Sequence, residues 1–152
     1  MRWMMVKMKD ITYGNILVPI DETKISKKVI DNALHIASME NGRIIVIYVE
    51  EPNYLKSLPD EFHEKLADLV IKNIEANLEY AAKQSEIHGI EFHTRVVRGR
   101  NPGREIINIA KENKVDLTVM GTESLRSDPF GSLTRWLIAA DIGPVLVITA
   151  GD

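Results

Sequence analysis

Five short runs of mostly β-branched, apolar residues, separated by segments with helical periodicity, constrain this fold more than any other feature of the chain. The runs occupy residues 16–21, 43–49, 90–97, 115–120 and 145–149. Runs of this length are typical of strands that are buried on both faces of a sheet. Because helical segments separate them, we predict right-handed βαβ units, and hence an α/β fold. The expected architecture is one open, mainly parallel sheet of five strands with helices on both faces.

Apolar residues recur at helical spacing in four segments between these runs. The predicted helices cover residues 25–41, 60–87, 102–113 and 133–140. Asn41 and Gly89 are suited to end the first two helices, and Asn101 followed by Pro102 is suited to begin the third. The residues Ser57 to Asp60 have the form of a capping box at the start of the second helix. That helix is long enough for one end to stand clear of the sheet.

Length and charge exclude several classes of function. A chain of 152 residues supports one sizeable core, so we expect an arm over residues 1–13 and a single domain over 14–152. The net charge of −3 offers no basic surface for nucleic acid, and no apolar run is long enough to cross a membrane. There is no cysteine, and the N-terminus lacks the apolar core of a signal peptide, so we expect a cytoplasmic protein.

Ligands of such sheets bind outside the carboxyl ends of the strands, at the point where the strand order reverses. Asp21, Val49, Gly99 and Gly121 all lie at or just past predicted strand ends. A polar loop then joins Gly121 to residues 131–132, which open the fourth helix, and backbone N–H groups at a helix start can face an anion. We therefore expect one ligand crevice at this edge.

These residues give the chain a resemblance to the universal stress protein family over residues 13–150. The segments that carry it are NILVPID at 15–21, VRG at 97–99, VDLTVMG at 115–121, GS at 131–132 and PVLVI at 144–148. The resemblance implies a Rossmann-like sheet with strand order 3-2-1-4-5. It also implies a homodimer, which in this family sometimes pairs through the last strand, here Val145 to Thr149.

In the ATP-binding branch of that family the phosphate loop reads G-x2-G-x9-G-[ST]. Gly121 matches its first glycine and Gly131 with Ser132 its last pair, while Asp21 and Val49 match the contacts to the nucleoside. The candidate cofactor-binding residues that follow from the resemblance are Pro19, Asp21, Val49, Gly99, Met120, Gly121, Gly131, Ser132 and Leu133.

The middle of the loop departs from that pattern. Ser124 stands where the second glycine belongs, and nine residues separate Gly121 from Gly131, three fewer than the pattern has. Losing two amide contacts to phosphate, at about 1.5 to 3 kcal/mol each, weakens a micromolar site by two or more decades. These magnitudes argue against tight ATP binding. Arginines near the crevice offer charge for another anion, and Asp128 is more simply a turn residue than a Mg²⁺ ligand. The arginines are Arg98, Arg100, Arg104 and Arg126.

Several of these residues have a structural alternative. Asp21 is suited equally to hold a ribose and to cap the following turn, and Ser132 to bind phosphate or to cap its helix. Trp136 is interpreted as a core residue rather than a dimer anchor. The four histidines lack metal-binding spacing, and no serine lies in a nucleophile elbow.

Two functional hypotheses remain. The first is a dimeric stress-response or regulatory protein that acts by binding a ligand or partner and has no catalytic site. The second is an adenine nucleotide switch that takes ATP with Mg²⁺, with or without slow hydrolysis, although no residue is evident as the general base.

Overall fold

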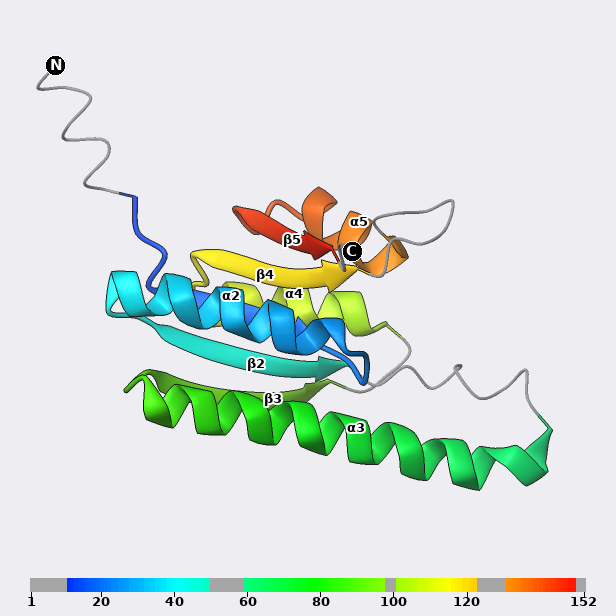
Figure 1. Ribbon diagram of the computed structural model, residues 1–152. Coiled ribbons are helices and arrows are strands. Elements are labelled where there is room, and N and C mark those ends of the chain that lie inside the picture. The colour runs from blue at the N-terminus through cyan, green and yellow to red at the C-terminus, as the bar shows by residue number, and fades with distance from the viewer. Residues whose placement is uncertain (1–10, 50–58, 98–100, 123–130, 150–152) are drawn as a thin grey trace, which may run out of the picture.

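The computed structural model describes residues 11–49, 59–97, 101–122 and 131–149, in which strands and helices alternate along the chain (Figure 1). The strands are β1 (Asn15–Ile20), β2 (Arg43–Val49), β3 (Glu91–Val97), β4 (Leu117–Thr122) and β5 (Val145–Thr149). The helices are α2 (Ile25–Glu40), α3 (Asp60–Ile87), α4 (Pro102–Glu112) and α5 (Gly131–Ala139). The predicted alternation of strand and helix is confirmed.

The strands form one sheet in the order β3-β2-β1-β4-β5, and all four strand pairings are parallel. This confirms the strand order that the family resemblance implies. The chain begins at the centre of the sheet, moves outward to β3, and then crosses back to β4 on the other side of β1. Residues Ile16, Leu17 and Val18 of β1 are completely buried, as expected of a central strand covered on both faces.

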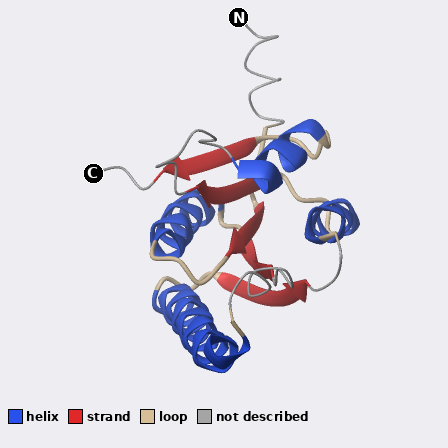
Figure 2. Cartoon of the chain, turned by 90° about the vertical axis from the view of Figure 1, so that its right-hand side faces the viewer, coloured by secondary structure: helices blue, strands red, loops and turns tan. Residues whose placement is uncertain are grey.

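Helices cover both faces of the sheet and give it two cores, as the view along the strands shows (Figure 2). Successive strand residues point to opposite faces, so alternate residues of β1 contribute to different cores. One core joins β1 and β2 to α2 and α3, through Ile16, Val18, Val29, Ala33, Ile44 and Ala81. The other joins them to α4 and α5, through Leu17, Ile45, Ile47, Ile106, Ala110 and Leu137.

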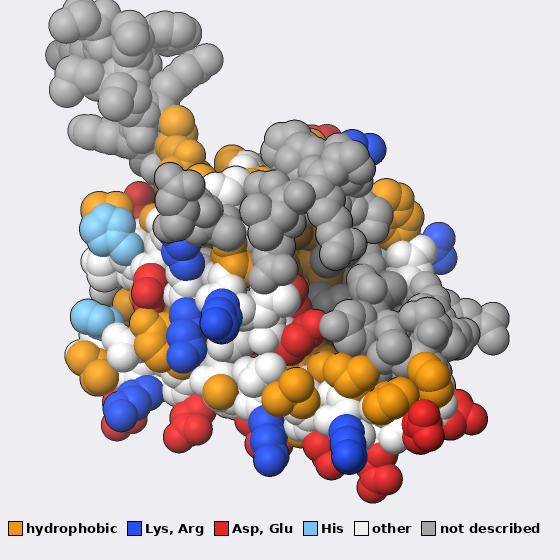
Figure 3. Space-filling view, turned by 45° about the vertical axis from the view of Figure 1, so that its right-hand side comes forward, with side chains coloured by type: hydrophobic (Ala, Val, Ile, Leu, Met, Phe, Trp, Pro, Cys, Tyr) orange, Lys and Arg blue, Asp and Glu red, His pale blue; other side chains and the backbone are white. Residues whose placement is uncertain are grey.

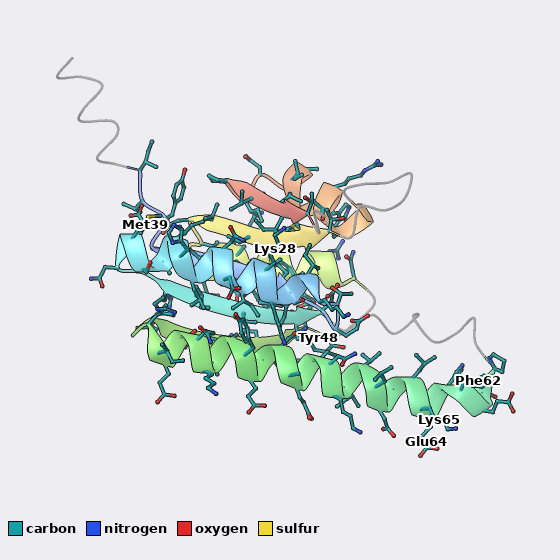
Figure 4. The ribbon with its side chains drawn as sticks, viewed as in Figure 1. Lys28, Met39, Tyr48, Phe62, Glu64 and Lys65 are labelled. Atoms are coloured by element: carbon teal, nitrogen blue, oxygen red, sulfur yellow. The ribbon has the colours of Figure 1, made fainter. Side chains whose placement is uncertain are left out.

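Helix α3 is much longer than the strands that it covers. Its 28 residues span about 42 Å, against about 23 Å for a strand of seven residues. Its buried residues begin only at Ile74, and its first half extends past the carboxyl ends of the strands (Figure 1). Phe62, Glu64 and Lys65 mark this far end (Figure 4). The prediction that one end of this helix stands clear of the sheet is correct.

The predicted helix ends are mostly confirmed. Asn41 follows α2 in the left-handed conformation, and Gly89 follows α3 with a φ of 65° while the N–H of Ile90 donates to the carbonyl of Ser85. The Asn101 side chain accepts from the N–H of Arg104 at the start of α4. The capping box is not confirmed: α3 is preceded by Pro59, which has no side-chain cap, and Ser57 lies outside the described residues.

Two other predictions need correction. The fourth strand begins at Leu117 rather than at Val115, because the N–H of Val115 still donates to Ala110 at the end of α4. The strand also ends later than predicted, at Thr122, so Gly121 lies inside β4 rather than in the loop. Trp136 is 45% exposed and is not a core residue, since its ring lies across the surface of α4 at Gly103.

Within the described part of the chain, no helix is both long and apolar enough to cross a membrane.

Candidate functional site

The sheet reverses its order between β1 and β4, and this is the point where ligands of such sheets bind. The pairing of Ile16 with Leu117 and of Leu17 with Thr118 aligns the two strands in parallel. The carboxyl ends of β1 and β4 therefore lie at the same edge. Helix α5 begins at this edge too, and α3 extends past it (Figure 1). We call this part of the molecule the rim.

Asp21 follows β1 at the rim, and its carboxylate organises the loop that leads into α2. Its Oδ1 atom accepts from the backbone N–H of Thr23 at 2.8 Å and from the Thr23 hydroxyl at 2.5 Å. The hydroxyl of Ser26 lies 3.2 Å from the same atom. Asp21 thus caps the turn, one of its two predicted roles. The residue is exposed, and these three bonds all go to Oδ1.

The same loop is also held from α3. Asn77 is 4% exposed, and its Nδ2 donates to the carbonyl oxygen of Asp21 at 2.9 Å and to that of Thr23 at 3.2 Å. Asn77 is not among the site residues predicted from the sequence. The available signal was a carboxamide at a helical position between Ile74 and Ala81, where the pattern is otherwise apolar.

Gly121 lies under α2. A β-carbon at this position would be 2.7 Å from Val29 Cγ2 and 3.1 Å from Ile25 Cγ1, so a larger residue requires these side chains or the helix to shift. The glycine that the motif assigns to a phosphate loop therefore has a packing role of its own. Its neighbour Met120 is 3% exposed in the core on the α4 side, and Pro19 is buried in β1. Only the backbone of these two residues can face a ligand at the rim.

The remaining candidates are placed only in part. Val49 ends β2, and the pairing of Ile20 with Tyr48 puts Val49 at the same edge as Asp21. Gly131 is the first residue of α5, with Ser132 and Leu133 in its first turn. The first N–H groups of a helix have no partner within it, so this turn directs donors outward. Three candidates of the loops lie outside the described residues: Gly99, Ser124 and Asp128.

Of the four arginines predicted near the crevice, one lies within the described residues. Arg104 lies in the first turn of α4 and is exposed, whereas Arg98, Arg100 and Arg126 lie outside the described residues. Lys28 of α2 donates to the carbonyl of Thr149 at 3.0 Å and so joins the helix to the end of β5 (Figure 4).

Among the described residues, the pKa values of Tyr80 and Glu91 are shifted, and both side chains lie away from the rim. The hydroxyl of Tyr80 donates to Asp31 at 2.6 Å, which raises the pKa of Tyr80 to about 12. A hydrogen bond with His93, at 2.8 Å, lowers the pKa of Glu91 at the amino end of β3. Among the residues that the structure describes, no group of three or more His, Asp or Glu side chains could hold a metal ion.

Comparison with known proteins places this geometry in a family. The profile described as the Universal stress protein family matches residues 12–149. The chain belongs to the universal stress protein family. It is 30% identical over 140 residues to universal stress protein MJ0531 of Methanocaldococcus jannaschii, an alignment that covers 90% of this chain and 82% of that protein. It is 26% identical to universal stress protein YxiE of Bacillus subtilis, over 90% of this chain and 99% of the relative.

The fold of this universal stress protein also agrees with a solved structure. The structure of protein MJ0577 has a TM-score of 0.73 and 25% identity, and covers 93% of this chain and 99% of its own. The shared fold therefore extends over nearly the whole of both chains.

Proposed function

We propose that this universal stress protein is a regulatory protein that binds an adenine nucleotide at the rim and has no chemical step of its own. One observation carries the proposal: at the reversal point between β1 and β4, the exposed carboxylate of Asp21 lies at the same edge as the first turn of α5. Oδ2 of Asp21 is suited to accept from a ribose hydroxyl. The N–H groups of the α5 turn are suited to receive a phosphate.

Two similar solved structures support an adenine nucleotide as the ligand. One is a universal stress protein in complex with cAMP, with 22% identity and a TM-score of 0.66. The other is the universal stress protein from Archaeoglobus fulgidus in complex with dAMP, with 24% identity and a TM-score of 0.63. Both ligands carry a single phosphate. We infer that this chain, too, takes a nucleoside monophosphate.

The loop between β4 and α5 favours the same class of ligand. It is three residues shorter than the ATP-binding pattern and has Ser124 in place of a glycine, so it offers fewer amides to a triphosphate. A single phosphate needs only the first turn of α5. We therefore propose AMP, or a compound like it, in preference to ATP with Mg²⁺.

Isothermal titration calorimetry on the full chain tests this proposal. We expect AMP to bind, and ATP with Mg²⁺ to bind no more tightly. Asp21→Asn keeps Oδ1 for the loop but replaces Oδ2 with a donor, and it should weaken AMP binding about tenfold or more, as the loss of a charge-assisted hydrogen bond does. Glu40→Gln makes the same change of charge at the other end of α2 and should leave affinity unchanged. Absence of heat with millimolar AMP would reject the proposal.

We also propose that the protein is a homodimer that pairs through the edge of β5. The two edge strands differ in charge, which controls whether the edge of a sheet pairs with another chain. β3 presents Glu91, His93 and Arg95, and charged side chains protect an edge from pairing with another chain. β5 reads VLVIT and has no charged residue. An uncharged edge of this kind favours pairing with a second copy through two-fold symmetry.

A further inference from the structure

Asn77 is a buried polar residue of α3 whose side chain hydrogen-bonds to a distant part of the chain. It is 4% exposed and lies between Ile74 and Ala81 on the side of the helix that packs onto the fold. A carboxamide in such a place destabilises the protein unless it is hydrogen-bonded. Its two bonds go to carbonyl oxygens of the loop between β1 and α2, 56 and 54 residues away.

Other hydrogen bonds of this loop are made within it and to the start of α2. Lys24, which precedes α2, makes no side-chain cap. The carboxylate of Asp21 binds Thr23 and Ser26, which lie two and five residues further along the chain. These bonds join the turn to itself and to the start of α2. The side chain of Asn77 joins the same turn to α3.

We propose that Asn77 is a positioning residue for the adenine nucleotide site, and that it acts by fixing the loop that carries Asp21. This inference rests on the proposed function. Asp21 is the first residue after β1, and its carbonyl is one of the two that Asn77 binds. A donor at residue 77 therefore sets the direction in which the carboxylate of Asp21 faces the rim. A site positioned before its ligand arrives does not lose affinity to the ordering of this loop.

The chemistry of the bond identifies the substitutions that test it. Asn77→Leu keeps a similar volume but removes the α3 donor from both carbonyl oxygens, which then keep only their bonds from Ser26. Asn77→Asp instead sets a carboxylate against both oxygens, which repels them. Ser85→Ala is a matched control: Ser85 is 1% exposed on the same helix, and its hydroxyl donates only to Ala81 of that helix, at 2.7 Å. It removes a buried hydrogen bond without touching the loop.

The experiment combines calorimetry with AMP, thermal unfolding and amide hydrogen exchange on the full chain. We expect both Asn77 variants to weaken AMP binding at least tenfold and Ser85→Ala by less than twofold, even where the melting temperatures fall by similar amounts. The N–H groups of Thr23 and Ser26 should exchange faster in the Asn77 variants only. This loop-specific change distinguishes positioning from a general loss of stability, and Asn77→Leu supplies the result if Asn77→Asp does not fold.

The outcomes separate this inference from the proposed function. If the unmodified chain binds AMP and the Asn77 variants bind it equally well, the inference is wrong and the proposed function stands. If the unmodified chain binds no AMP, the proposed function is wrong, and the nucleotide role of Asn77 is overturned with it. Unchanged exchange at Thr23 and Ser26 in Asn77→Leu would also overturn the inference, whether or not AMP binds.

Discussion

Gly121 of β4 and Val29 of α2 are in such close contact that a β-carbon on the glycine would lie 2.7 Å from Cγ2 of the valine. Contacts this short do not occur between real side chains, so α2 can approach the sheet here only over a glycine. The motif that marks a phosphate loop thus coincides with a point of helix packing. Loss of ligand binding on mutation of Gly121 would not by itself identify a phosphate contact.

We expect Gly121→Ala to lower the free energy of unfolding by about 1 to 3 kcal/mol, the usual result of overpacking a core. Gly14→Ala is the control, because the nearest atom to its added carbon is 4.0 Å away. Urea denaturation measures both variants. In a double-mutant cycle, Val29→Ala should recover part of the loss, since it removes the methyl group that clashes. Additive effects of the two substitutions would contradict this contact.

Replacement of Thr118 by valine should stabilise the protein. Its side chain is fully buried in β4, and its hydroxyl has no hydrogen-bond partner within the described part of the chain. Because an unpaired buried hydroxyl is unfavourable, Thr118→Val is expected to raise the free energy of unfolding by about 1 kcal/mol. Chemical denaturation measures the change. A destabilised variant would indicate that the hydroxyl is hydrogen-bonded after all.

The hydrogen bond between Tyr80 and Asp31 should be visible in an alkaline titration. It favours the protonated phenol and raises the pKa of Tyr80 from 10.0 to about 12. Its contribution to stability is therefore complete below pH 10 and is lost as the pH rises toward 12. We expect the ultraviolet absorbance of tyrosinate to show one late ionisation, which Tyr80→Phe abolishes.

Asp31→Asn should move this late ionisation back toward the ordinary range of tyrosine, because the negative charge that opposes ionisation is removed. An unchanged late ionisation in Asp31→Asn would show that Asp31 is not its cause.

The proposed pairing through β5 predicts that a charge on this strand separates the dimer. Leu146 is 38% exposed, and Leu146→Lys should produce a monomer by introducing the kind of residue that protects β3. Val96→Lys makes the same change on β3, where Val96 is 57% exposed, and should leave the dimer intact. Sedimentation velocity at micromolar concentration measures both. A monomeric unmodified chain, or a dimer lost only in Val96→Lys, would refute pairing through β5.

Much of the fold could be read from local patterns. The β-branched run of β1 and the helical spacing of Val29, Ala33 and Ala37 specify a strand and the covered face of a helix without reference to distant residues. Asn41, Gly89 and Asn101 likewise mark helix ends, because each acts on backbone groups a few positions away. The strand order was implied instead by the family resemblance.

The residues that shape the candidate site were harder to foresee. Asp21 was placed at a strand end correctly, but whether it caps the turn depended on where Thr23 and Ser26 lie. Trp136 is a large apolar residue of the kind found in cores, but it is half exposed. Its ring packs on the surface of another helix, α4, at Gly103. Such outcomes depend on which helices meet, and this information is not contained in one segment's periodicity.

Local sequence patterns were therefore enough to predict the helices and strands of this protein and their order along the chain. Only the tertiary structure decided that Gly121 lies beneath Val29 and that Asn77 holds the loop of Asp21. The physical reason is one of range. Helix and strand patterns reflect interactions between neighbours along the chain, whereas these two contacts join residues 92 and 56 positions apart and exist only once the layers have packed.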